Sequence, residues 1–179
     1  MGDKRALQSG TSHFLGQNFA KAFGTQYLDK NNVLQHVWQT SWGVSTRMVG
    51  AIVMVHGDDK GLILPPVLAP IQVVIVPIWR KEPERDAIMA AIADLKAKLA
   101  GVRLRVDERE DLSPGFKFND WEMRGVPLRI EIGPRDLAAN QVTLARRDTG
   151  EKLPVPIAEL AVRVPQMLKE IQTNLLRRA

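Results

Sequence analysis

The run Gly10-Thr11-Ser12-His13 brings two hydroxyls and an imidazole together just before an apolar stretch. The stretch from Leu15 to Phe23 repeats apolar residues at helical spacing, so we expect the run to open a helix. A helix N-terminus can hold a small polar or anionic ligand. A Ser/Thr helix cap beside an exposed histidine accounts for the same residues, and the spacing alone favours this simpler interpretation.

A second cluster, from Thr40 to Arg47, ends in an arginine at the start of the apolar run Met48 to Val55. The spacing of this run fits a buried helix and a buried strand alike, and Ser45 as a cap and Gly57 as a stop slightly favour the helix. A charge buried without a partner is too costly, so Arg47 is expected to meet an anion. A phosphate and a structural carboxylate would satisfy it equally well.

The segment from Ser113 to Asp136 interleaves aromatic side chains with Lys, Arg and Glu. Unstacked RNA bases stack on planar side chains and pair with polar ones, so the segment predicts an RNA-binding surface. The alternative is that Phe116, Phe118 and Trp121 belong to the core, and at least some of them must.

Metal chemistry finds little support in the sequence. The segment His56-Gly57-Asp58-Asp59 has no ligand framework of known spacing, and a turn that closes a helix explains it better. The histidines at 13, 36 and 56 lack the His-x-x-x-His spacing of zinc enzymes. The absence of cysteine excludes disulfides, thiolate zinc sites and a cysteine nucleophile, and it suits a reducing cytosol.

Charge points to an anionic partner without identifying it. The chain has 25 Lys and Arg against 20 Asp and Glu, a net charge of +5 and a pI near 9.7. Such a balance is compatible with nucleic acid but does not require it. The N-terminus has no apolar core of a secretory signal, and prolines interrupt the most apolar stretch, Leu62 to Trp79, so we expect no membrane association.

The elements that must position these residues differ between the two halves. Up to about Pro70 we expect short elements, among them the Leu15–Phe23 helix ended by Gly24 and an extended Val37–Trp42; Leu64 to Pro70 reads as a linker. The second half alternates strands and helices, which predicts an α/β layer domain. Its expected strands are Gln72–Ile78, Val102–Val106, Pro127–Ile132 and Val142–Ala145, and its expected helices are Glu82–Ala100, Gly115–Arg124 and a closing helix that carries Leu160, Val164, Leu168, Ile171 and Leu175 on one face.

Several blocks taken together resemble class II prolyl-tRNA synthetases of the archaeal/eukaryotic-like branch. They are GTSHFLGQNFAKAF, WQTSWGVSTRMVGAIVMVHGDDKGLILPPVLAP, QVVIVPI, and SPGFKFNDWEMRGVPLRIEIGPRD followed by RRDTGEK, in family order from about Ala6 onward. The resemblance implies that residues 1–70 are the C-terminal portion of an α+β catalytic domain with an antiparallel sheet, including motif 3. Residues 71–179 would be an anticodon-binding α/β domain with a mixed sheet.

The resemblance also implies residue roles. Arg47 matches the motif 3 arginine and would act in catalysis, binding ATP together with Gln8, Thr11 and Ser45. His13, Ser41, Trp42 and Gly43 would line the proline pocket, and Lys117, Glu122, Arg129 and Asp136 would meet the anticodon. The reaction would be attack of the proline carboxylate on the ATP α-phosphate, with Mg²⁺, followed by prolyl transfer to tRNA-Pro. Glu122 is alternatively a structural partner of Arg129.

The departures from the family pattern are large. Motif 1, which builds the homodimer interface of the full-length proteins, and motif 2, whose arginine holds the α-phosphate, are absent. We therefore expect a fragment of a cytoplasmic proline–tRNA ligase that is inactive by itself. The main alternative is a catalytically silent, synthetase-derived tRNA-binding module, and the remaining one is a basic α/β domain that binds a protein.

Overall fold

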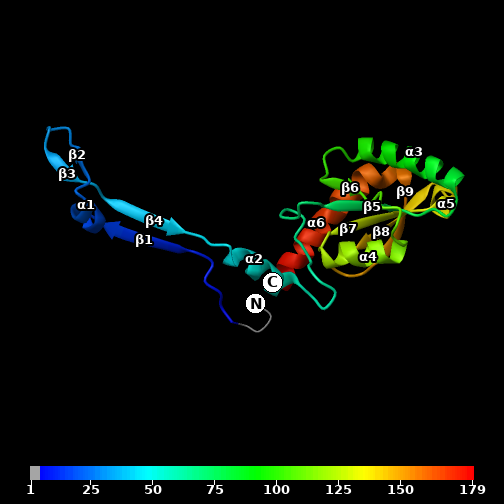
Figure 1. Cartoon of the computed structure of the whole chain (residues 1–179), viewed down its shortest axis with the longest axis horizontal. Coiled ribbons are helices and arrows are strands. Elements are labelled where there is room, and N and C mark those ends of the chain that lie inside the picture. The colour runs from blue at the N-terminus through cyan, green and yellow to red at the C-terminus, as the bar shows by residue number, and fades with distance from the viewer. Residues whose placement is uncertain (1–4) are drawn as a thin grey trace. The chain divides into compact units, whose positions relative to one another are not determined.

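The computed structural model describes residues 5–179 and contains two compact units, one ending at Met54 and the other spanning Val55–Ala179 (Figure 1). Each unit has its own sheets, and the helix α2, Arg47–His56, contains the boundary. No helix among the described residues is long and apolar enough to cross a membrane.

The first unit is built from two small antiparallel sheets. Strand β1 (Thr11–Gly16) pairs with β4 (Gln39–Gly43), and β2 (Gln26–Leu28) pairs with β3 (Leu34–His36). Helix α1 (Asn18–Phe23) ends as predicted at Gly24, whose φ of 65° is the left-handed conformation that glycine adopts without steric cost.

The expected helix start at Gly10-Thr11-Ser12-His13 is wrong, because this run enters strand β1. Ser12 lies opposite Trp42 and His13 opposite Ser41 in the ladder with β4. The helix begins later, at Asn18. Cap residues and strand residues overlap in type, and the strand is defined by a partner far along the chain that local spacing does not reveal.

The first unit has almost no core of its own. Among residues 5–54, Ala20 alone is buried, while Phe14, Phe23 and Trp42 are each more than 70% exposed. The helix α2 is correctly located by its sequence pattern, but the expectation that it is buried is wrong, since it has no buried residue. The argument that Arg47 needs an anionic partner because it is buried therefore fails.

The second unit has a five-stranded mixed sheet in the order β6-β5-β7-β8-β9. Strands β6 (Leu104–Val106), β5 (Val73–Pro77) and β7 (Leu128–Ile132) are parallel, and β8 (Gln141–Arg146) and β9 (Lys152–Pro156) continue antiparallel. The helices are α3 (Glu82–Lys98), α4 (Pro114–Met123), α5 (Pro134–Ala138) and α6 (Leu160–Arg178), with a 3-10 turn at Ile157–Glu159. The predicted α/β class and mixed sheet are confirmed.

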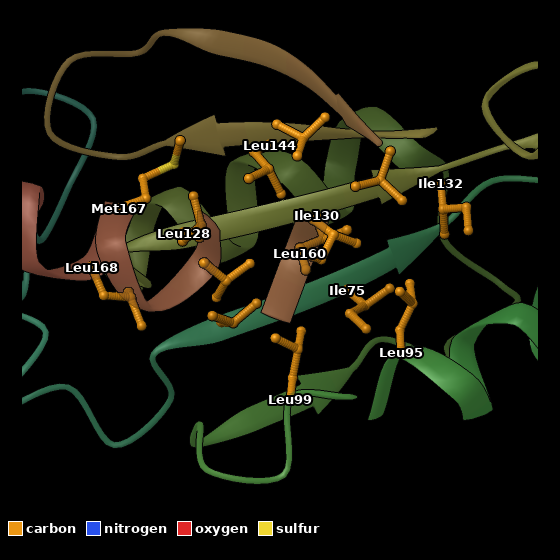
Figure 2. Close-up of a cluster of buried hydrophobic side chains, with 14 of the residues drawn as sticks. Ile75, Leu95, Leu99, Leu128, Ile130, Ile132, Leu144, Leu160, Met167 and Leu168 are labelled. Atoms are coloured by element: carbon orange, nitrogen blue, oxygen red, sulfur yellow. The ribbon is translucent and has the colours of Figure 1, made fainter. Parts of the chain in front are cut away.

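Side-chain alternation divides this sheet into two different faces. One face packs Ile75, Ile130 and Leu144 against helices α3 and α6, which contribute Leu95, Leu99, Leu160 and Met167 (Figure 2). The other face packs Val74 and Val76 against Trp121 of α4 and Val126. Helices α3 and α4 thus lie on opposite sides of the sheet (Figure 1).

The proline-rich segment Leu64 to Pro70 has no regular helix or strand, as predicted, but it belongs to the second unit. Pro65, Pro66 and Ala69 are buried, and the guanidinium of Arg103 donates to the carbonyl oxygens of Pro66 (2.8 Å) and Ala69 (2.9 Å). The unit begins upstream of the segment, at Val55. The assignment of residues 1–70 and 71–179 to two domains stays a prediction.

We expect backbone amides of residues 5–54 to exchange with solvent faster than those of residues 73–175 in native-state hydrogen exchange. Few buried apolar contacts oppose local opening in the first unit, whereas the second unit has a continuous core. Mass spectrometry on peptides from both regions measures the difference. Equal protection would contradict this interpretation.

Candidate functional site

Four of the candidate nucleotide-binding residues meet around one pocket in the first unit. The pocket, of about 280 Å³, is lined by Gln8, Thr11, Ser45, Arg47 and their neighbours Ser9, Gly10, Gly43 and Val44. The guanidinium of Arg47 donates to Gln8 Oε1 at 3.1 Å, and the Arg47 backbone N–H donates to Ser45 Oγ at 3.3 Å. Among residues 5–179, the side-chain partner of Arg47 is therefore a neutral amide, which does not compensate its charge.

The pocket residues suit phosphate better than they suit a metal ion. Arg47, three hydroxyls and an amide are hydrogen-bond donors for phosphate oxygens. None of the lining residues is acidic, so they offer no carboxylate to Mg²⁺. Among residues 5–179 no group of three His, Cys, Asp or Glu side chains is placed to hold a metal.

The candidate proline-binding residues lie on the β1–β4 ladder, but their side chains do not all share one face. His13 is directly opposite Ser41, so these two side chains are neighbours. Trp42 follows Ser41 in the strand and therefore projects to the other face. Gly43, opposite Thr11, lines the nucleotide pocket instead. The proline-binding role of these residues stays a prediction.

In the second unit, charged side chains lie on the sheet face that α4 only partly covers. Arg129 is opposite Val74 and Glu131 is opposite Val76, so both project toward the α4 side. In the ladder, Ala145 on β8 lies opposite Arg129, and Lys152 on β9 lies opposite Ala145, so Lys152 is on the same face. We call Glu122, Arg129, Glu131, Lys152 and the ring of Phe118 the charged cluster.

Arg129 is the centre of the charged cluster. Its guanidinium donates to Glu122 Oε1 at 2.9 Å and to Glu131 Oε1 at 2.9 Å, and it lies 4.2 Å from the centre of the Phe118 ring. Arg129 is 6% exposed and Glu131 8% exposed, so these charges require each other. The alternative that Glu122 is a structural partner of Arg129 is therefore realised in the structure.

The outer members of the charged cluster remain accessible. The Lys152 ammonium lies 2.9 Å from Glu131 and 5.2 Å from the Phe118 ring centre, with its side chain 49% exposed. The Glu122 side chain is 30% exposed. A carboxylate and an ammonium thus face solvent beside a buried arginine and a partly buried aromatic ring, and such groups can pair with an unstacked base.

Two of the predicted anticodon residues lie elsewhere. Lys117 is 3% exposed, and its ammonium donates to the Asp107 carbonyl oxygen at 3.4 Å. Asp136 accepts a hydrogen bond from the Gly133 backbone N–H at 2.9 Å and so caps α5. Among the described residues, these hydrogen bonds connect Lys117 and Asp136 to groups outside the charged cluster. Of the aromatic residues, Trp121 is core, as the alternative required, and Phe116 is exposed.

Glu131 and Lys152 were not among the predicted site residues. The apolar–charged alternation of Leu128–Ile132 contains the signal for Glu131, because Arg129 and Glu131 are two apart on one strand. Lys152 depends on strand β9, which follows a turn at Thr149 and Gly150 and was not predicted. The glycine in that turn has a φ of 74°.

Helix α4 is held in place by a buried carboxylate. Asp107, 2% exposed, accepts from Trp121 Nε1 at 2.7 Å and from the Arg109 guanidinium at 2.7 and 2.8 Å. Burial by itself raises the pKa of Asp107, but the hydrogen bonds from Arg109 and Trp121 outweigh it and lower the pKa to about 2. The ionised form is therefore the one that the fold stabilises.

The fold and the charged cluster define a mixed α/β domain with a face suited to RNA. Residues 72–167 match the family model described as an anticodon binding domain, and the chain belongs to this family. It is 58% identical to a proline–tRNA ligase of Symbiobacterium thermophilum and 55% identical to the chloroplastic/mitochondrial proline–tRNA ligase of Arabidopsis thaliana, with all of this chain and 37% and 34% of those proteins covered. A proline–tRNA ligase of Cenarchaeum symbiosum is 56% identical over 98% of this chain and 37% of its own length. The chain thus spans about a third of the length of these relatives.

We expect Asp107→Asn to lower the free energy of unfolding by about 2 kcal/mol at pH 7, because a charge-assisted hydrogen-bond pair is lost. The folded-state pKa of Asp107 is below its ordinary value of 3.8, so its contribution is complete above about pH 4 and declines toward pH 2. The difference between wild type and variant should therefore shrink as the pH falls. Urea unfolding at pH 7 and pH 2.5 measures both differences, and a constant difference would contradict the assignment.

Proposed function

We propose that this chain supplies the anticodon-reading domain and part of the ATP site of a proline–tRNA ligase. The observation that carries the proposal is the charged cluster, which presents an accessible carboxylate and ammonium beside a partly buried aromatic ring in the domain matched to the anticodon-binding family. The names of the relatives support the choice of proline and tRNA-Pro as substrates.

On this proposal, Glu122 and Lys152 contact the anticodon bases of tRNA-Pro. A carboxylate accepts hydrogen bonds from the ring and amino N–H groups of guanine, and an ammonium donates to its O6/N7 edge. Arg129, with its N–H groups committed to Glu122 and Glu131, aligns both carboxylates rather than acting as the outermost contact. Phe118 provides a ring on which a base can stack. Lys117 and Asp136 support the fold around this surface.

The first unit contributes to the proposed ATP-dependent activation of proline. Arg47 binds the nucleotide with Gln8, Thr11 and Ser45, and preorganised donors of this kind favour the charge that builds on phosphate oxygens in the reaction. His13, Ser41, Trp42 and Gly43 form the proline side of the site. ATP and Mg²⁺ are the proposed cofactors; the described pocket residues would supply donors to the phosphates and no carboxylate to the ion. The complete enzyme is proposed to be a cytoplasmic homodimer.

A silent tRNA-binding module is the second candidate. The exposed, coreless first unit favours it, because an active site built on such a sheet is poorly held. The gathering of Gln8, Thr11, Ser45 and Arg47 around one pocket favours the ligase. The two candidates share the anticodon-reading domain and differ only in nucleotide chemistry.

We expect the chain to bind tRNA-Pro at least about tenfold more tightly than the same tRNA with a changed anticodon, a difference of about 1.4 kcal/mol. Fluorescence titrations at one fixed salt concentration measure both affinities, because phosphate contacts depend on salt. Glu122→Gln should reduce this preference. Equal, salt-sensitive binding of both tRNAs would mean that only the basic surface acts, and would refute anticodon reading.

We expect the 179-residue chain alone to show no proline-dependent ATP–pyrophosphate exchange. Its nucleotide pocket lies in a unit with a single buried residue among those described, which does not hold catalytic groups rigidly. Binding of ATP to the isolated chain should likewise be weak, and Arg47→Ala is the matched control. Exchange that Arg47→Ala abolishes would contradict this expectation.

A further inference from the structure

Arg147 contacts the end of helix α4 from the strand-to-turn junction after β8. Its Nε donates to the carbonyl oxygen of Glu122 at 3.0 Å, at the last turn of the helix. The same carbonyl oxygen accepts from the Gly125 N–H at 3.0 Å, so Arg147 adds a second donor, and a cation at a helix C-terminus also favours the helix dipole. Arg147 therefore fixes the backbone of the residue whose side chain belongs to the charged cluster.

The rest of the Arg147 guanidinium is held by Asp58. Nη1 donates to Asp58 Oδ2 at 2.8 Å, and Nη2 donates to Asp58 Oδ1 at 2.6 Å. This two-point pairing sets the plane of the guanidinium, which a lysine could not reproduce. The hydrogen bond from Arg147 is the main cause that lowers the pKa of Asp58 to about 2, so Asp58 is ionised at neutral pH.

The segment after Asp58 is also fitted closely to the end of α4. The Leu62 N–H donates to the Met123 carbonyl oxygen at 3.0 Å, and the Leu64 N–H donates to the Gly125 carbonyl oxygen at 3.1 Å. A Cβ on Gly61 would lie 2.5 Å from Met123 Cα, so the two backbones meet where a side chain has no room. Residues 58–64 and the end of α4 form one joined surface.

We propose that Arg147 and Asp58 are positioning residues for anticodon recognition, because they hold Glu122 at the end of α4 in the orientation that reads a base. This inference rests on the proposed function. Removing the pair should leave α4 folded, since Ser113, Asp107 and Trp121 secure its other contacts. The loss should instead appear as a weaker distinction between anticodons.

The test compares the ratio of dissociation constants for anticodon-changed tRNA and tRNA-Pro among variants of the whole chain. We expect Arg147→Lys and the milder Asp58→Asn to reduce the ratio at least threefold, mainly through weaker binding of tRNA-Pro. The matched control is Arg146→Lys, which disturbs a buried two-point pair with Asp148, whereas Arg147 is the residue that donates to the Glu122 carbonyl oxygen. Thermal unfolding identifies a temperature at which all variants are folded.

Each outcome of this experiment either supports or overturns the inference about Arg147 and Asp58. A ratio that falls for Arg147→Lys and Asp58→Asn but not for Arg146→Lys supports the inference. Unchanged ratios in the first two variants, or an equal fall in the control, overturn it while leaving anticodon reading by the wild type intact. A wild-type ratio near one overturns the proposed function itself, and the inference with it.

Discussion

The buried guanidinium of Arg129 is the interaction on which the functional face of the second unit depends. A charge on the α4 side of the sheet is stable only if other charges enclose it, and Glu122 from the helix and Glu131 from the strand do so at 2.9 Å each. Lys152, on strand β9, forms an ion pair with the Glu131 carboxylate. Helix α4 and strands β7 and β9 are thus joined by one row of alternating charges. The polar surface follows from the need to pair these charges.

The two faces of the five-stranded sheet differ in the size of their apolar cores and in the charges beside them. The face toward α3 and α6 carries the larger apolar core of the unit (Figure 2), and the charged Arg146 lies at its edge and pairs with Glu170 of α6. Only Val74, Val76, Trp121 and Val126 form a core on the other face. This smaller core leaves room for ionised side chains beside it. The described part of the first unit has no comparable apolar core, since most side chains on its β1–β4 and β2–β3 ladders are exposed.

Local patterns predicted the second unit well and the first unit less well. The stripe of Ile88, Ile92 and Leu95 identified α3 because its period is that of a buried helix face. Strand β9 was missed because Pro154 and Pro156 normally exclude strand, and they are tolerated here on an edge. The strand at Thr11 and the burial of Arg129 depend on partners distant in sequence. No local spacing contains that information, and Glu122 and Arg129 became candidates only through the resemblance to a known family.

The proline-rich segment Leu64 to Pro70 has a consequence for how the chain can be divided. It looks like a hinge in the sequence, yet Arg103 binds its carbonyl groups and residues 62 and 64 pair with the end of α4. Cleavage there would strip hydrogen-bond partners from the interior of the second unit. The smallest autonomous folding piece therefore starts before Asp58. A swap of this domain between related proteins should therefore exchange the turn after helix α2, which contains Asp58, together with the five-stranded sheet.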